Sequence, residues 1–140
     1  MTLPKSIGLP RMLVETGEKR VFLPEFVEFL NSIGLHIYIE EGYGSRLGYT
    51  FDDFRRGSEN VHQCNRTQAF SQDIILILRA PKREEFRLLK QDSILISMLH
   101  FPTRPGRVEA LIQQKINAIS LDSIIDDFNV RRIENMPSVA

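Results

Sequence analysis

The sequence predicts a single α/β domain of the doubly wound type, with about six short strands in a mostly parallel sheet. Two runs of branched apolar residues, Ile74–Leu78 and Ile94–Met98, have the composition of strands buried on both faces. Segments with helical periodicity alternate with these and the other candidate strands. A chain of 140 residues is long enough to form one domain with a sizeable core. This architecture does not by itself determine a function.

The first two strands are expected on either side of one helix. Ser6–Leu9 is a short apolar strand that Pro10 closes. Pro24 is placed to open a helix with one apolar face, and Gly34 is placed to end it. Leu35–Ile39 then forms the second strand, so this part of the chain predicts a βαβ unit.

The middle of the chain is more polar and its elements are short. Thr50 with Asp53 three residues later predicts a capping box at the start of a helix that runs to Gly57. The polar region after it holds a short strand near Asn60–His62 and a helical turn near Thr67–Phe70.

The second half repeats the strand–helix alternation. The sequence predicts helices at Pro81–Leu89 and Pro105–Lys115, the latter with Val108, Leu111 and Ile112 facing inward, and a last strand at Ala118–Leu121. Alternating strands and helices of this length predict a Rossmann-like or flavodoxin-like sheet covered on both faces.

Composition excludes several classes of function. Eighteen basic and eighteen acidic residues give a net charge of zero, so no global charge favours nucleic acid or an anionic membrane. Cys64 is the only cysteine, so no intramolecular disulfide forms. No apolar run approaches the roughly 18 residues of a membrane span, and the N-terminus has no long apolar core. We therefore expect a cytoplasmic protein.

Two polar side chains stand where buried strands end. Arg79 follows Ile74–Leu78 directly, and His100 follows the next apolar run, 21 residues later. The carboxyl ends of parallel strands open into the crevice where ligands bind. A guanidinium there suits a carboxylate or phosphate, and an imidazole there suits acid–base chemistry. Each residue also has a simpler interpretation: Arg79 reaching solvent, and His100 hydrogen-bonded to a loop carbonyl.

Other candidate residues are weaker. His36, His62 and Cys64 do not have the spacing of metal ligands. The pair Asp52 and Asp53 fits a helix N-terminus, and the pair at positions 126 and 127 fits a turn, so neither predicts a catalytic dyad.

A glycine-rich loop follows the second predicted strand. Gly42, Gly44 and Gly48 have the spacing G-x-G-x-x-x-G, whereas the dinucleotide fingerprint is G-x-G-x-x-G directly after the first strand. The loop therefore does not predict nucleotide binding.

A series of segments in this chain resembles a known family. In order they are IGLP, EKRVFLPEFVEFL, GYGSRLGYTFDDF, ILRAP, ILISMLH and NMPSVA. Together they resemble the N-terminal domain shared by alanine dehydrogenase, the alpha subunit of proton-translocating transhydrogenase, and lysine-forming saccharopine dehydrogenase. The resemblance covers essentially the whole chain, and the collinear order of the segments is its most specific feature.

The resemblance implies roles for three residues. The family's arginine before the first helix, which holds the substrate carboxylate, matches Arg20, although one extra residue separates Pro10 from Arg20. Its lysine at the end of the fourth strand matches Arg79, which can orient a substrate but cannot give up a proton. Its histidine matches His100, the acid or base during imine formation from a 2-oxo acid. The transhydrogenase branch tends to carry glutamine at that position.

The resemblance also implies a partner that this sequence lacks. Enzymes of the family continue into a nicotinamide-binding domain with a G-x-G-x-x-G loop, which is absent from residues 1–140. The resemblance therefore implies NAD or NADP for a full-length enzyme, none bound by this chain alone, and a small amino acid or 2-oxo acid as ligand. The chain is then a fragment, half of a split enzyme that pairs with a cofactor domain or subunit, or a stand-alone binding module. A homo-oligomer is compatible with each. A receiver-like signalling domain is disfavoured, because Leu9, Pro10 and Arg11 provide no acidic cluster.

Overall fold

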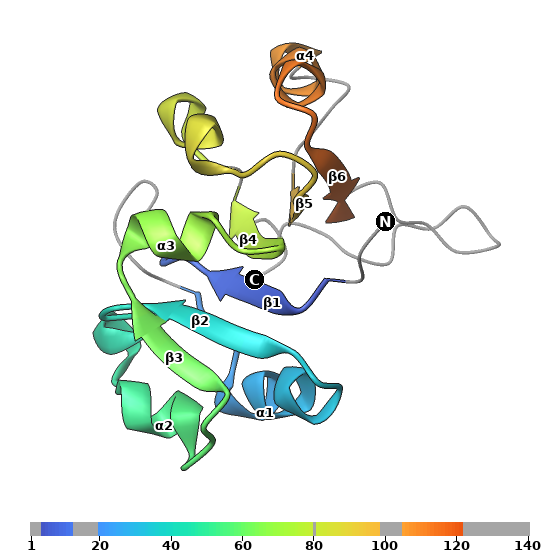
Figure 1. Ribbon diagram of the computed structural model, residues 1–140. Coiled ribbons are helices and arrows are strands. Elements are labelled where there is room, and N and C mark those ends of the chain that lie inside the picture. The colour runs from blue at the N-terminus through green and yellow to red at the C-terminus, as the bar shows by residue number, and fades with distance from the viewer. Residues whose placement is uncertain (1–3, 13–19, 80, 99–104, 122–140) are drawn as a thin grey trace, which may run out of the picture.

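The computed structural model describes residues 4–12, 20–79, 81–98 and 105–121. In these residues six strands form one sheet in the order β3-β2-β1-β4-β5-β6, and every neighbouring pair is parallel (Figure 1). The strands are β1 (Ser6–Leu9), β2 (His36–Glu40), β3 (Val61–Cys64), β4 (Ile74–Arg79), β5 (Ile94–Met98) and β6 (Asn117–Ser120). This is the doubly wound, Rossmann-like order, so the predicted fold class is confirmed.

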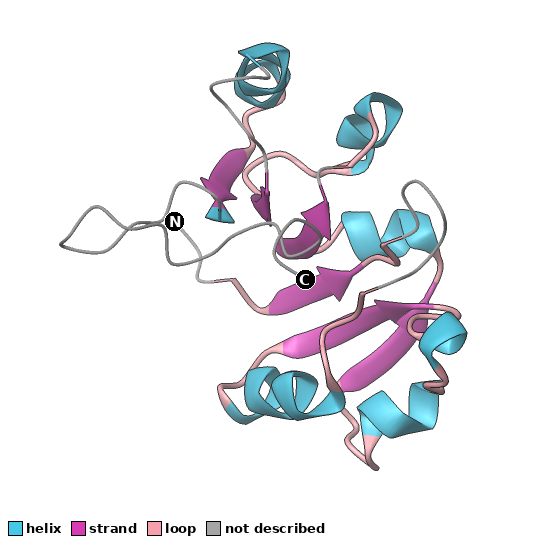
Figure 2. Cartoon of the chain, turned by 180° about the vertical axis from the view of Figure 1, so that it is seen from behind, coloured by secondary structure: helices cyan, strands magenta, loops and turns pink. Residues whose placement is uncertain are grey.

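Within the described residues, four α-helices and two 3₁₀ helices connect the strands. They are α1 (Pro24–Ser32), η1 (Ser45–Leu47), α2 (Phe51–Arg55), α3 (Arg66–Phe70), η2 (Arg83–Leu88) and α4 (Pro105–Gln113). Helices α1 and α2 lie on one side of the sheet, and α3 lies on the other (Figures 1 and 2). None of the helices in the described part of the chain is both long and apolar enough to cross a membrane.

Local sequence explains where the first helices begin and end. Pro24 is the first residue of α1, and Gly34 after the helix has a φ of 95°, which favours glycine. Asp53 accepts a hydrogen bond from the Thr50 N–H at 2.7 Å and completes the predicted capping box of α2. Asn65 and Gln68 form a second capping box, at the start of α3.

The core lies on both faces of the sheet. Side chains from β1, β2, β4, β5 and α1 contribute to it, and all of them are almost fully buried. These residues are Ile7, Leu9, Val27, Leu30, Ile37, Ile39, Ile75, Ile77 and Leu95. Gly8 allows α3 to approach β1, because a Cβ at Gly8 would stand 1.8 Å from the Ala69 carbonyl oxygen.

Two predictions about helices differ from the structure. The segment predicted as a helix over Pro81–Leu89 is helical over Arg83–Leu88, where it forms the 3₁₀ helix η2. The buried Phe86 and Leu89, the residue directly after η2, are three apart, as a 3₁₀ period favours. In α4, Leu111 is buried as predicted, but Ile112 is 70% exposed. Adjacent residues of a helix point about 100° apart, so only one of this pair faces the sheet.

Candidate functional site at the carboxyl edge of the sheet

The strand order reverses between β1 and β4, and β4 extends further toward its carboxyl end than β1 does. Their pairing covers only Ile7 with Ile74 and Gly8 with Ile75, whereas β4 continues to Arg79. A crevice at the carboxyl end of such a reversal is the usual ligand site of an open α/β sheet. We therefore take this edge as the candidate functional site.

Of the three predicted residues, the structure places Arg79 at this edge. Arg79 is the half-buried last residue of β4 and pairs in register with Met98 of β5, beyond an irregularity in the strand pairing. Arg20 is half-buried in the segment that leads into α1. His100 lies outside the described residues, two positions after Met98. The roles of Arg20, Arg79 and His100 thus stay predictions.

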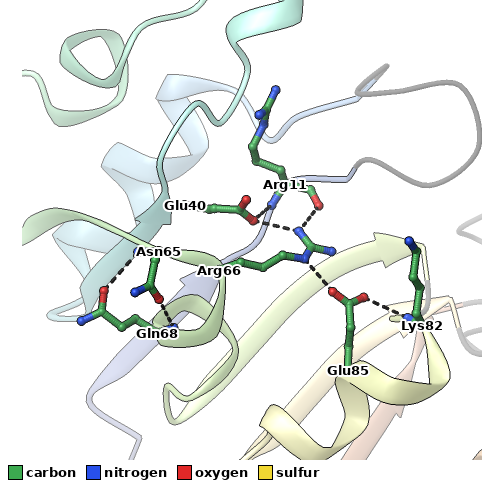
Figure 3. A network of polar contacts seen from close by, with 7 residues as sticks. All are labelled: Arg11, Glu40, Asn65, Arg66, Gln68, Lys82 and Glu85. Atoms are coloured by element: carbon green, nitrogen blue, oxygen red, sulfur yellow. Dashed lines mark hydrogen bonds and ion pairs between the residues drawn. The ribbon is translucent and has the colours of Figure 1, made fainter.

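A polar network that the sequence did not reveal crosses the same edge (Figure 3). The Arg66 Nη1 donates to Glu40 Oε1 at 2.8 Å and to the Arg11 carbonyl at 2.9 Å. The Arg66 Nε donates to Glu85 Oε2 at 2.6 Å. Glu40 also accepts the Arg11 N–H at 2.9 Å, and Glu85 accepts the Lys82 N–H at 3.0 Å. One guanidinium therefore connects the end of β2, the segment after β1 and the helix η2.

The network is shielded from solvent. The side chains of Glu40 and Glu85 are 11% and 14% exposed, and that of Arg66 is 26% exposed and stacks over the Phe70 ring. Burial by itself would raise the pKa of Glu85, but the hydrogen bonds from Arg66 and the Lys82 N–H outweigh it and hold that pKa below its usual range. Glu85 is therefore a fixed anion rather than a base at neutral pH.

The sequence contained one signal for this network. The pattern Asn65, Arg66, Thr67, Gln68 is a capping box, so Arg66 is the first residue of a helix that follows a parallel strand. A helix that directly follows a parallel strand begins at the carboxyl edge of the sheet. The acceptors Glu40 and Glu85 could not be found in this way, because their distance from Arg66 depends on the tertiary fold.

The glycine-rich loop after β2 folds inward. Gly42, Gly44 and Gly48 have φ values of 83°, 76° and 88°, and the turn buries Tyr43 against Phe54 with ring centroids 5.3 Å apart. The Tyr43 hydroxyl accepts the Phe22 N–H at 2.9 Å. These contacts give the loop a packing role between β2 and the segment before α1.

The structure also shows the surroundings of the weaker candidates from the sequence, namely His36, His62 and Cys64. His36 Nδ1 and His62 Nε2 are 3.4 Å apart on β2 and β3. Burial raises the pKa of the Cys64 thiol to about 11, with the carboxylates of Glu40 and Glu41 adding to the effect. The described residues contain no cluster of three or more side chains suited to a metal ion. The aspartate pair at positions 126 and 127 lies outside the described residues.

A hollow of about 370 Å³ lies beside α1 and α2, with Glu25, Asp52, Asp53 and Arg56 among its lining residues. Arg56 is already paired with Glu25 at 3.2 Å and with Glu28 at 2.8 Å. The excess of acidic groups opposes the binding of a carboxylate there.

The fold and this edge define a class: a Rossmann-like domain with Arg66 and Arg79 at the carboxyl edge of its sheet. The model of the family "Alanine dehydrogenase/PNT, N-terminal domain" matches residues 8–140, and the chain belongs to this family. The similarity to saccharopine dehydrogenase stays a prediction.

Individual relatives agree with the family. The chain is 25% identical over 118 residues to alanine dehydrogenase of Methanococcus maripaludis, covering 84% of this chain and 32% of that protein. It is 22% identical over 134 residues to the NAD(P) transhydrogenase subunit alpha of Haemophilus influenzae, covering 96% of this chain and 26% of that protein.

Solved structures show the same fold. An L-alanine dehydrogenase has a TM-score of 0.78 at 24% identity, over 89% of this chain and 34% of that chain. A transhydrogenase from Sinorhizobium meliloti has a TM-score of 0.74 at 17% identity, over 84% of this chain and 35% of that chain. The present chain thus spans about a third or less of the length of these relatives.

Proposed function

We propose that this chain is the substrate-binding half of an NAD(P)-dependent amino-acid dehydrogenase, which interconverts an amino acid and its 2-oxo acid. The observation that carries the proposal is the family match over residues 8–140, together with Arg79 at the carboxyl end of β4, beside the strand reversal. The domain works together with a separate nicotinamide-binding domain or subunit.

The described residues do not fit a nicotinamide cofactor at the strand reversal. A dinucleotide fold places a tight glycine turn directly after its first strand, but Leu9, Pro10 and Arg11 stand there. The acidic residue at the end of β2, Glu40, accepts bonds from Arg11 and Arg66. This arrangement supports a two-domain enzyme in which the partner domain binds the cofactor.

In the proposed reaction, Arg20 and Arg79 hold the carboxylate of the acid. A guanidinium can form two parallel hydrogen bonds with a carboxylate, which fixes the orientation of the neighbouring carbonyl carbon. Arg79 stays charged at neutral pH and therefore binds and orients without moving a proton.

His100 carries out the proton transfer. When an amine has added to the 2-oxo acid, the imidazolium gives its proton to the carbinolamine hydroxyl, which leaves as water while the C=N bond forms. In the deamination direction the neutral imidazole takes a proton from the attacking water. An unperturbed pKa near 6.5 suits both directions near neutral pH.

The test is a calorimetric screen of amino acids and 2-oxo acids against the chain, with and without the cofactor domain of a relative. We expect a 2-oxo acid to bind, and turnover to appear only when the cofactor domain is supplied. Binding without turnover in every combination would instead identify a non-catalytic binding module. The absence of any acid binding would overturn the proposal.

A matched variant tests the role of His100. In the reconstituted enzyme, His100→Ala should lower turnover by about 10²–10⁴-fold, while the melting temperature changes little. Surface residue His36 provides the control, since His36→Ala should leave turnover unchanged. A destabilised His100→Ala protein with near-normal turnover would show that His100 has a structural role only.

A further inference from the structure

In the described residues, the two halves of the sheet pair through the middle of β1 and the amino end of β4. The pairing of β1 with β4 stops at Gly8 and Ile75, although β1 pairs with β2 along all four of its residues. The register pairs with β1 end at Ile75, and β4 continues for four residues to Arg79; we call the part of the β1–β4 boundary beyond these pairs the gap. The carboxyl ends of the two halves are therefore not held together by the strand ladder.

Side chains connect the halves across this gap. Arg66 belongs to the β1–β3 half, where its Nη1 bonds Glu40 and the Arg11 carbonyl. Its Nε bonds Glu85 of η2, which belongs to the β4–β6 half. We call Arg66, Glu40 and Glu85 the clasp (Figure 3). A weaker contact, from the Leu78 N–H to Met12 Sδ at 3.4 Å, crosses the same gap.

The clasp fixes backbone next to the ends of both strands. Glu85 accepts the Lys82 N–H, three residues after Arg79, with the buried Pro81 in between. Glu40 accepts the N–H of Arg11, two residues after the end of β1. A planar guanidinium with donors in a fixed fork can hold both carboxylates at one separation, which a flexible ammonium cannot do.

We propose that Arg66 is a positioning residue: the Arg66–Glu85 bond across the gap between β1 and β4 sets the width of the crevice and holds Arg79 in place for a carboxylate ligand. The identity of that ligand rests on the proposed function. Misplacement of a binding group by about 1 Å is enough to lower activity by about 100-fold. Because the clasp holds the backbone next to Arg79, its loss should weaken ligand binding.

The test compares two neighbouring glutamates of η2. Glu85→Ala cuts the bond across the gap and leaves Arg66 paired with Glu40. Glu84→Ala, at an exposed neighbouring position, makes the same change in side chain and serves as the control. Arg66→Lys is a second test variant, because it keeps the charge and removes the fork.

Amide hydrogen exchange in the ligand-free chain is measured first. We expect Glu85→Ala and Arg66→Lys to increase exchange about tenfold or more at Leu78 and Arg79, with β3 unchanged. The Arg79 Nε–Hε resonance should shift in both variants. Glu84→Ala should alter neither. Equal exchange and an unmoved Arg79 resonance in all proteins would overturn the clasp, even if the melting temperature falls.

Binding of the 2-oxo acid found in the screen is measured next. The dissociation constant should rise about tenfold in Glu85→Ala and Arg66→Lys, and stay unchanged in Glu84→Ala. An unchanged dissociation constant in all three variants would overturn the positioning role. If the wild-type chain binds no acid, the proposed function fails, and the exchange measurement alone decides whether the clasp exists.

Discussion

At the scale of single residues, the candidate site depends on arginines whose surroundings differ. Arg66 is fixed by two carboxylates and a carbonyl within 2.9 Å, so its charge is used inside the protein. Arg79 stands at the end of a strand where the neighbouring strand has already stopped pairing. The contacts of Arg66 give it a structural task, whereas the binding task of Arg79 is part of the proposed function.

The binding task of Arg79 predicts a graded loss of affinity. Arg79→Lys should weaken the binding of a 2-oxo acid, since an ammonium cannot form the two parallel bonds. Arg79→Ala should weaken it more, by about 1.5–3 kcal/mol, the contribution of a hydrogen bond to a charged group. Calorimetry on the two variants and the wild-type chain checks this. Three equal affinities would show that Arg79 does not contact the ligand.

At the scale of elements, α4 illustrates how one helix face is selected. Leu111 is 3% exposed and its neighbour Ile112 is 70% exposed, although both are branched apolar residues of similar volume. The helix packs beside β6, so only a narrow stripe of it meets the core. The environment of each position therefore decides its contribution to stability.

A pair of alanine variants tests this assignment. Leu111→Ala should lower the free energy of unfolding by about 2–5 kcal/mol, because it removes buried methyl groups and leaves a cavity. Ile112→Ala should change it by no more than about 0.5 kcal/mol, because the side chain is already in water. Urea unfolding of both proteins gives the two values. A larger loss for Ile112→Ala would indicate that another surface covers this residue.

At the scale of the whole molecule, two acidic residues connect distant parts of the chain. Asp73, before β4, is paired with Lys90 and accepts the backbone N–H groups of Lys5 and Ser6 at 2.8 and 3.2 Å. The Lys90 bond first, and then the Lys5 N–H, hold the pKa of Asp73 below its usual range. The pKa of Glu85 is lowered as well.

These lowered pKa values predict acid-sensitive stability. A carboxyl group with a lower pKa in the folded chain stabilises it above the unfolded pKa, about 4, and loses this contribution as the pH falls through the folded value. Stability should therefore decrease on acidification below about pH 4. Urea midpoints measured from pH 3 to pH 7 should show a smaller decrease for Asp73→Asn than for the wild-type chain. Parallel curves would contradict the assignment.

The whole domain is also predicted not to bind a nicotinamide cofactor by itself. Calorimetry of the chain with NAD and with NADP should detect no binding, because the turn after β1 contains no phosphate-binding glycines and Glu40 is engaged by Arg66. Adding the cofactor domain of a relative should restore binding. Micromolar affinity for the chain alone would contradict the two-domain proposal.

The sequence by itself determined the strands, most helix boundaries and the class of fold. Branched apolar runs such as Ile74–Leu78, the capping pair Thr50 and Asp53, and the stop at Gly34 are local signals, and each acts over only a few residues. The sequence also placed Arg79 at a strand end, because the position of a residue within its own element can be read from its neighbours.

Only the tertiary structure decided which side chains contact one another at the carboxyl edge of the sheet. The contacts of Arg66 with Glu40 and Glu85 join residues 26 and 19 positions apart. The choice between Leu111 and Ile112 depended on where α4 packs. Such outcomes follow from the strand order and from the shapes of neighbouring elements, which no local pattern specifies. The elements of this protein were thus set by short-range chemistry, and the connections of its candidate site were set by long-range packing.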